Sequence, residues 1–157
     1  MNENDFQKLT NLSKTLHKLN GKVKLLALLQ KAKNAYDANN YAECLETCKK
    51  VLKKDPNNAI AYRGLGCVMQ STGNNKKAIE YYFKALENSK NKEIEYTLIG
   101  TVYYNENNLE KAIENYNLAS DINDDYDPAY EGRNQSMLEN HLKILDLQDS
   151  LIKQNLF

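Results

Sequence analysis

The chain has 157 residues, of which 41% are hydrophobic and 27% are charged, and its formal net charge is zero. These values suit one globular domain with a sizeable core and exclude a chain that is disordered throughout. No run approaches the roughly 18 apolar residues of a membrane span, and the start Met1–Asp5 lacks the basic and apolar segments of a secretory signal, so we expect a cytoplasmic protein.

The zero net charge hides a strong division along the chain. Residues 1–92 hold 17 of the 21 Lys and Arg but only 8 of the 21 acidic residues, a balance of +9 that leaves −9 for residues 93–157. A charge asymmetry of this kind bears on association and on steering of partners, not on the fold.

Residues 1–22 are predicted to form an N-terminal amphipathic helix that ends at Asn20-Gly21. Its apolar residues recur at spacings of three and four: Phe6, Leu9, Leu12, Leu16 and Leu19. The stripe does not keep the register of the segments that follow. Three roles stay open for it: it caps the first helix pair, it pairs with its copy in a second chain, or it occupies a binding groove as a regulatory segment.

Three consecutive helix pairs are predicted at 23–58, 59–92 and 93–127, because residue types recur at intervals of 34. The recurring positions are Tyr62, Tyr96 and Tyr130, and then Gly66 and Gly100, Ala78 and Ala112, and Tyr82 and Tyr116. A fixed period of this length is the mark of a stacked helical array. Turns within the pairs are expected at Asn39-Asn40, Gly73-Asn74-Asn75 and Asn107-Asn108, where Gly and Asn tolerate the left-handed conformation that ends a helix.

The second pair shows how the helices of a pair are expected to pack. Tyr62, Leu65, Gly66 and Met69 fall on one helical face, which must be buried. The small residues Gly66 and Ala78 let two backbones approach closely, with Tyr82 filling the adjoining space.

From about Leu25 to Tyr130 the chain resembles the tetratricopeptide repeat family. The match is strongest from Ala59 to Glu87, reading AIAYRGLGCVMQSTGNNKKAIEYYFKALE, and it continues from Glu93 to Ser120. The first repeat is looser, with Lys31 in place of Leu65 and Ile99. The resemblance implies an all-α fold, a right-handed α-solenoid of three helix-turn-helix repeats, in which the first helix of every pair lines a concave groove.

Residues 128–157 are predicted to form one long C-terminal capping helix, because Gly132 is the sole Gly or Pro after Pro128 in the sequence and a last repeat needs its open face covered. An apolar stripe continues along its distal half: Leu138, Leu142, Leu145, Ile152 and Leu156, interrupted by Asp149. Two interpretations stay open, a short coiled-coil seam and packing on the third repeat.

The sequence carries no complete motif for catalysis, metal binding or nucleotide binding, so we expect no enzyme and no cofactor. Cys44, Cys48 and Cys67 form no metal-ligand spacing and are predicted to be core residues. The acidic turn from Asp121 to Asp127 has Tyr126 where a calcium loop requires glycine. The lysine run at residues 49–54 falls on the second helix of the first pair, and specific nucleic-acid binding is not expected.

The groove is the candidate site. By the geometry of the family its floor carries Leu29, Lys33, Tyr36, Ile60, Arg63, Cys67, Gln70, Ile94, Thr97, Thr101, Tyr104 and Glu131. Aliphatic and aromatic anchors with neutral donors between them suit an extended or helical peptide with apolar side chains. Arg63 and Lys33 are expected to meet acidic groups of a ligand, and Glu131 a basic one.

Some members of the family grip the C-terminal carboxylate of a partner with Lys, Asn and Arg side chains. This chain departs from that pattern, since it carries Leu29, Gly64, Ile94 and Leu98 at clamp positions and keeps only Lys33. The leading hypothesis is therefore a non-catalytic adaptor that binds a protein or peptide partner in the groove. The alternatives are a scaffold that self-assembles through its terminal helices and oppositely charged ends, as a homo-oligomer, and a secretion-type chaperone with an apolar groove.

Overall fold

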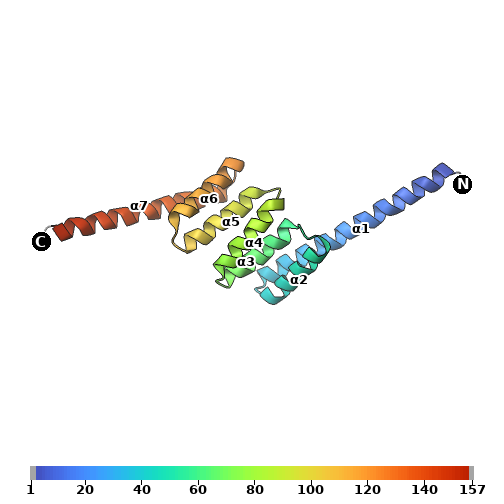
Figure 1. Cartoon of the computed structure of the whole chain (residues 1–157), viewed down its shortest axis with the longest axis horizontal. Coiled ribbons are helices and arrows are strands. Elements are labelled where there is room, and N and C mark those ends of the chain that lie inside the picture. The colour runs from blue at the N-terminus through green and yellow to red at the C-terminus, as the bar shows by residue number, and fades with distance from the viewer. Residues whose placement is uncertain (1–2, 156–157) are drawn as a thin grey trace.

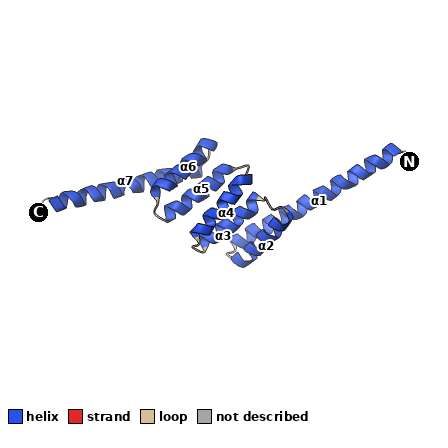
Figure 2. Cartoon of the chain, viewed as in Figure 1, coloured by secondary structure: helices blue, strands red, loops and turns tan. Residues whose placement is uncertain are grey.

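The computed structural model describes residues 3–155, with side chains described from residue 7 to residue 154. Over this range the chain forms helices joined by short turns and contains no strand (Figure 2). The helices are α1 (Glu3–Asp37), α2 (Tyr41–Lys54), α3 (Ala59–Ser71), α4 (Asn75–Asn88), α5 (Lys92–Asn105), α6 (Leu109–Ile122) and α7 (Asp127–Asn155). The predicted all-α solenoid is confirmed.

The helices pack in sequential order, so the molecule is an elongated stack (Figure 1). Pairs α1–α2, α3–α4 and α5–α6 make the closest contacts, each pair packs on the next, and α7 covers α6 and part of α5. The two ends of the chain lie at opposite ends of the stack. Because each pair contacts only its neighbours, the core is a row of local clusters rather than one closed centre.

The turns within the three pairs are built alike. Asn39, Gly73 and Asn107, which occupy the same position of successive repeats, have positive φ angles of 57°, 77° and 62°. The amide that follows each of them donates back across the helix end, as in the hydrogen bond from Asn74 N to the carbonyl of Met69 at 2.8 Å, which satisfies a carbonyl that the helix leaves open. The predicted turns are confirmed, and their residues are those that tolerate a left-handed backbone.

Asparagine also begins most of these helices. The side chains of Asn40, Asn58, Asn74 and Asn108 each accept a hydrogen bond from the backbone amide three residues later, at the N-termini of α2, α3, α4 and α6. This capping supplies a partner to an amide that has none within the helix. Each of these short helices, 13 or 14 residues long, thereby gains a hydrogen-bonded N-terminus.

A tyrosine ring set against a glycine fixes the distance between the helices of a pair. Tyr82 is fully buried, and a Cβ added at Gly66 would lie 2.4 Å from its ring; Tyr116 and Gly100 repeat the arrangement with a distance of 2.9 Å. Both distances are shorter than any side chain tolerates. Glycine at these positions is therefore required by packing, as the spacing in the sequence predicts.

The prediction that the N-terminal helix ends at Asn20-Gly21 is wrong. Helix α1 runs without a break from Glu3 to Asp37, so the boundary expected between residues 22 and 23 lies inside it. A glycine inside a helix costs only about 1 kcal/mol, and nothing packs near Gly21 to force a turn. The N-terminal half of α1 extends beyond the repeats (Figure 1).

The C-terminal helix α7 is continuous, as predicted, but its distal half does not pack on the third repeat. Leu138, Leu142, Leu145 and Ile152 are 61%, 52%, 43% and 58% exposed. Leu156 lies outside the described residues, as does the side chain of Phe6 at the other end. Within residues 3–155, no helix is long and apolar enough to cross a membrane.

We expect Gly73→Ala to lower the free energy of unfolding by ~1–2 kcal/mol, because alanine bears the full steric cost of a left-handed backbone. No atom lies within 4 Å of the added Cβ, so the effect isolates backbone strain. Urea unfolding followed by circular dichroism measures it. Gly21→Ala is the matched control: it also meets open space, lies within a helix and should not destabilise the protein. Equal losses in both variants would contradict the argument.

Candidate peptide-binding groove

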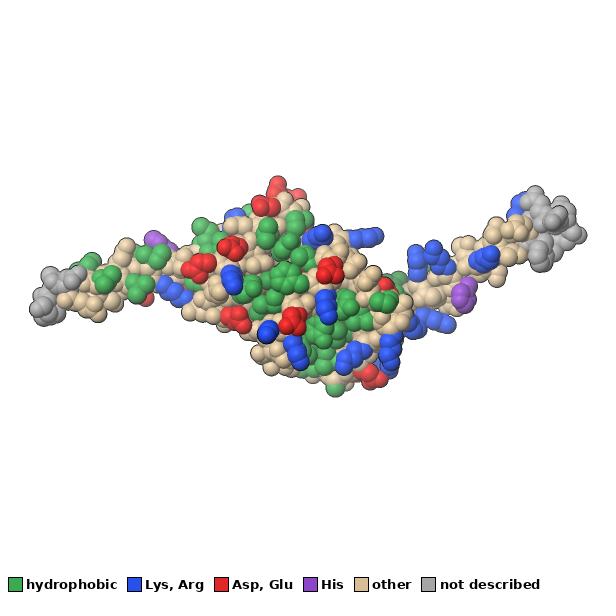
Figure 3. All heavy atoms as spheres, viewed as in Figure 1, with side chains coloured by type: hydrophobic (Ala, Val, Ile, Leu, Met, Phe, Trp, Pro, Cys, Tyr) green, Lys and Arg blue, Asp and Glu red, His purple; other side chains and the backbone are tan. Residues whose placement is uncertain are grey.

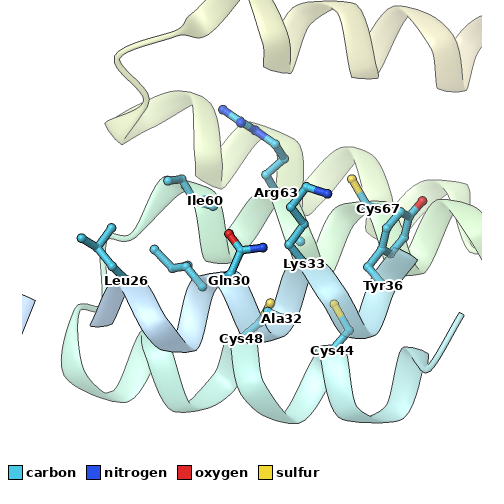
Figure 4. A pocket seen from close by; sticks show the side chains of 12 residues that line it. Leu26, Gln30, Ala32, Lys33, Tyr36, Cys44, Cys48, Ile60, Arg63 and Cys67 are labelled. Carbon is cyan, nitrogen blue, oxygen red and sulfur yellow. The ribbon is translucent and has the colours of Figure 1, made fainter. Parts of the chain in front are cut away.

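A cavity of about 420 Å³ opens between α1, α2 and α3 (Figure 4). Half of the predicted groove residues line it: Leu29, Lys33, Tyr36, Ile60, Arg63 and Cys67. Leu26, Gln30 and Ala32 complete the wall from α1, and Cys44 and Cys48 of α2 form its floor. The prediction from the sequence thus placed residues of two successive repeats around one hollow.

The cavity exists because the first repeat lacks a ring that the other repeats have. Cys48 occupies the position that Tyr82 and Tyr116 hold in the second and third repeats, and Ala32 occupies the position of Gly66. The Tyr116 ring fills the space between Gly100 and Gly132. In the first repeat only a thiol stands there, so the volume of the missing ring is left open.

The thiols that border the cavity are core groups, as predicted. Cys44 and Cys48 are each 1% exposed, and burial raises the pKa of Cys44 and Cys67 and raises that of Cys48 to about 12. These thiols are therefore protonated at neutral pH and weak nucleophiles. Between residues 7 and 154, no group of three or more His, Cys, Asp or Glu side chains is placed to hold a metal ion.

The polar groups of the cavity lie at its rim. The ammonium of Lys33 pairs with Asp37 at 2.5 Å, and both side chains are more than half exposed. The hydroxyl of Tyr36 shares a hydrogen bond of 2.9 Å with Ser71, and its ring packs against Tyr41. An apolar interior under a polar rim is the usual form of a side-chain binding pocket.

A second hollow, of about 480 Å³, lies where the turn after α2 meets the turn before α5. It shares Ile60 and Arg63 with the first cavity and adds Ile94, which is also a predicted groove residue. Its remaining lining is largely polar, including Asn58, Ser89 and Asn91. The two hollows together form a continuous lining from α1 to α5.

The other predicted groove residues are largely engaged within the protein. Gln70 accepts a hydrogen bond of 2.7 Å from Tyr82, and the hydroxyl of Thr101 lies 3.2 Å from that of Tyr116. The hydroxyl of Tyr104 accepts from Gln135 at 2.9 Å. Thr97 is half-buried and Glu131 is exposed. None of these side chains lines either of the two hollows described above.

Arg63 differs from its predicted role as a cation free to meet an acidic ligand. Its Nε and Nη2 both donate to Oε1 of Glu95, at 2.9 and 2.6 Å, and Glu95 is fully buried. The ion pair joins α3 to α5 and so ties the second repeat to the third. The main role of Arg63 is therefore to neutralise Glu95, because moving the guanidinium away would leave a buried carboxylate unpaired.

Reasoning from the sequence missed Glu95, although the repeat carries a signal for it. The equivalent positions in the neighbouring units, one repeat away on either side, are the fully buried Ala61 and Ala129. A charge among buried alanines requires a partner. Arg63, for its part, stands where the first repeat has Leu29 and the third has Thr97, so both members of the pair depart from the repeat together.

We expect Arg63→Leu alone to lower the free energy of unfolding by ~3–5 kcal/mol, because it leaves the Glu95 carboxylate buried without a counter-charge. Adding Glu95→Ala reproduces the Leu29 and Ala61 combination of the preceding interface and should restore stability to within about 1 kcal/mol of the native chain. Urea unfolding measures both. A double variant as unstable as the single one would show that the pair does not act as a unit.

Family models of the tetratricopeptide repeat match residues 47–80 and residues 96–126. Both lie within the repeats described above, and neither reaches α1 or α7. Neither model covers residues 23–46 of the looser first repeat or residues 81–92 of the second. No curated protein matches the sequence.

Solved structures resemble the fold at low sequence identity. One is the Thermobaculum terrenum O-GlcNAc transferase mutant K341M, 22% identical with a TM-score of 0.68; the match covers 74% of this chain and 22% of that one. A second is MamA, 21% identical with a TM-score of 0.66, over 94% of this chain and 90% of that one.

A third similar structure is the first tetratricopeptide domain of Spaghetti (RPAP3) bound to the HSP90 peptide SRMEEVD. It is 16% identical with a TM-score of 0.66, over 75% of this chain and 94% of that one. Identities this low establish the fold alone, whereas the family models identify the repeats themselves. The chain carries tetratricopeptide repeats at residues 47–80 and 96–126.

Proposed function

We propose that this protein is a non-catalytic adaptor that binds a peptide or helix of a partner protein along α1, α3 and α5 and anchors one large apolar side chain in the cavity of the first repeat. The cavity carries the proposal. It is open to the surface, its interior is made of aliphatic groups and protonated thiols, and no side chain of the described residues fills it.

The shape of the vacant space supports an aromatic anchor in particular. Its counterparts in the second and third repeats hold the rings of Tyr82 and Tyr116, both at most 3% exposed. A partner that supplies a Phe or Tyr side chain would complete the packing that the chain itself completes in the other repeats. Aromatic anchors in desolvated pockets dominate the energetics of most interfaces.

The remaining groove residues suit the flanks of such a ligand. Ile60 is 54% exposed between the two hollows, where it can contact an apolar neighbour of the anchor. Lys33 and Asp37 screen one another at the rim, so neither charge selects strongly for a charged peptide. The peptide complex of the Spaghetti domain, which shares the fold, supports a peptide as the class of ligand.

Filling the cavity from within tests this function. Cys48→Tyr restores the missing ring, and Ala32→Gly removes the methyl group that the ring would strike, so the double variant copies the second and third repeats. Peptides selected from a random library on the native chain should share a large apolar residue, most often aromatic. Their affinity for the filled variant should fall ~10- to 100-fold, as for loss of an anchor.

Cys48→Ala is the matched control, because it enlarges the cavity instead of filling it and should keep peptide binding. Thermal unfolding of each variant confirms that it folds. Peptides that bind the native and filled proteins equally well, as measured by isothermal titration calorimetry, would remove the cavity from the binding site. Selected peptides with no shared apolar residue would also count against the proposal.

A further inference from the structure

The exposed half of α1 carries an unbroken coiled-coil pattern. Its apolar residues alternate at spacings of three and four over three heptads, Leu9, Leu12, Leu16, Leu19, Val23 and Leu26, and each is between 53% and 63% exposed. The pattern runs through Gly21, because the helix does not end there. Positions a and d are thus all apolar from Leu9 to Leu26, which we call the α1 seam.

Most of the α1 seam lies beyond the repeats, and only its last residue, Leu26, borders the cavity of the first repeat. Where α1 packs on its own chain, its contacts come mainly from heptad positions c and f, Leu25, Leu28, Ala32 and Ala35, of which the two alanines are buried; Leu29 and Tyr36 at position g add to them. Positions c and f lie across the helix axis from a and d. Because the residues from Leu9 to Leu19 are more than half exposed and this part of α1 extends away from the stack (Figure 1), they neither cap the first pair nor occupy the groove of the same molecule.

We propose that two copies of this chain associate through the α1 seam as a parallel two-stranded coiled coil. The proposal goes beyond peptide binding and does not rest on it. Leu at all three d positions suits two strands, and the continuous helix, anchored in the first repeat, removes the cost of starting a helix that a free peptide of this length would bear. The next a and d positions are Gln30 and Lys33, so the seam ends where the repeats begin.

The arrangement of charges permits a second copy as partner. Residues 7–26 hold five lysines and no acid. Lys14, Lys18 and Lys24 fall at outer positions f, c and b, and basic side chains project from the extension at several places in Figure 3. In a parallel pair, position g faces position e of the other strand. Lys8 then faces Ser13 of the partner subunit, and Lys22 faces Ala27 of the partner subunit, so no two like charges meet across the seam.

The exposed apolar area of the α1 seam is sufficient for a specific interface between two chains. Twelve half-exposed Leu and Val side chains in a pair present on the order of 1,000 Å² of apolar surface, about the size at which specific protein interfaces begin. In a monomer this apolar stripe would remain exposed to water. The distal stripe of α7 is a poorer candidate, because Asp149 interrupts it.

Sedimentation equilibrium of the full chain tests the proposal. The native protein should show twice the monomer mass, and the dimer should tighten as salt rises, since screening removes the repulsion between the two basic helices. Leu16→Glu should give a monomer with unchanged helix content, because Leu16 is 57% exposed and supports no fold contact. Leu142→Glu on α7 is the matched control and should stay dimeric.

Strand direction is tested separately. Leu12→Cys should form an inter-chain disulfide under mild oxidation, because two d residues face each other in a parallel pair, whereas Lys14→Cys, on the outer face, should not. A native chain that is monomeric at all salt and protein concentrations would overturn the proposal. So would dissociation caused by Leu142→Glu, which would indicate contact through α7, or dissociation on raising the salt, which would indicate contact between the basic and acidic ends.

Discussion

The contact between a tyrosine ring and a glycine backbone determines how this molecule stacks. Tyr82 against Gly66, and Tyr116 against Gly100, bring the two helices of a pair close enough that any added methyl group would overlap the ring. The same Tyr116 ring also meets Gly132 of α7, so one side chain sets both the spacing within a pair and the spacing to the next helix. Helix packing at such short range depends on volume and not on charge.

Two departures from this packing rule give the molecule its distinctive features, a cavity and a buried ion pair. At the first pair a thiol replaces the ring, and the unfilled volume becomes the cavity. At the next interface Arg63 and Glu95 replace an apolar residue and an alanine, and the interface acquires a buried ion pair. A buried ion pair adds little stability compared with apolar packing. Its consequence is that only one register of α3 against α5 leaves no charge unpaired.

The sequence predicts the repeating part of the structure well, because local chemistry determines it. Asn39, Gly73 and Asn107 are the residues that a left-handed turn needs, and Gly66 and Tyr82 are complementary in volume within one hairpin. The predicted helix end at Asn20-Gly21 fails because one glycine costs a helix only about 1 kcal/mol, and nothing packs near Gly21 to force a turn. Glu95 was missed because its partner Arg63 lies in the preceding repeat, and a pairing between two repeats is not visible in the pattern of a single helix.

The cavity could not be predicted from single residues, because it results from an aromatic ring that the first repeat lacks. Taken alone, Cys48 is an ordinary core residue, and it is informative only in comparison with Tyr82 and Tyr116 at the same position of the other repeats. Helix α1 brings this cavity and the α1 seam together, because Leu26 belongs to both. A second chain seated on the seam would therefore lie at the mouth of the cavity. Because nearest-neighbour contacts dominate a stack of this kind, such coupling would be confined to the first repeat and would leave the acidic C-terminal end free for other contacts.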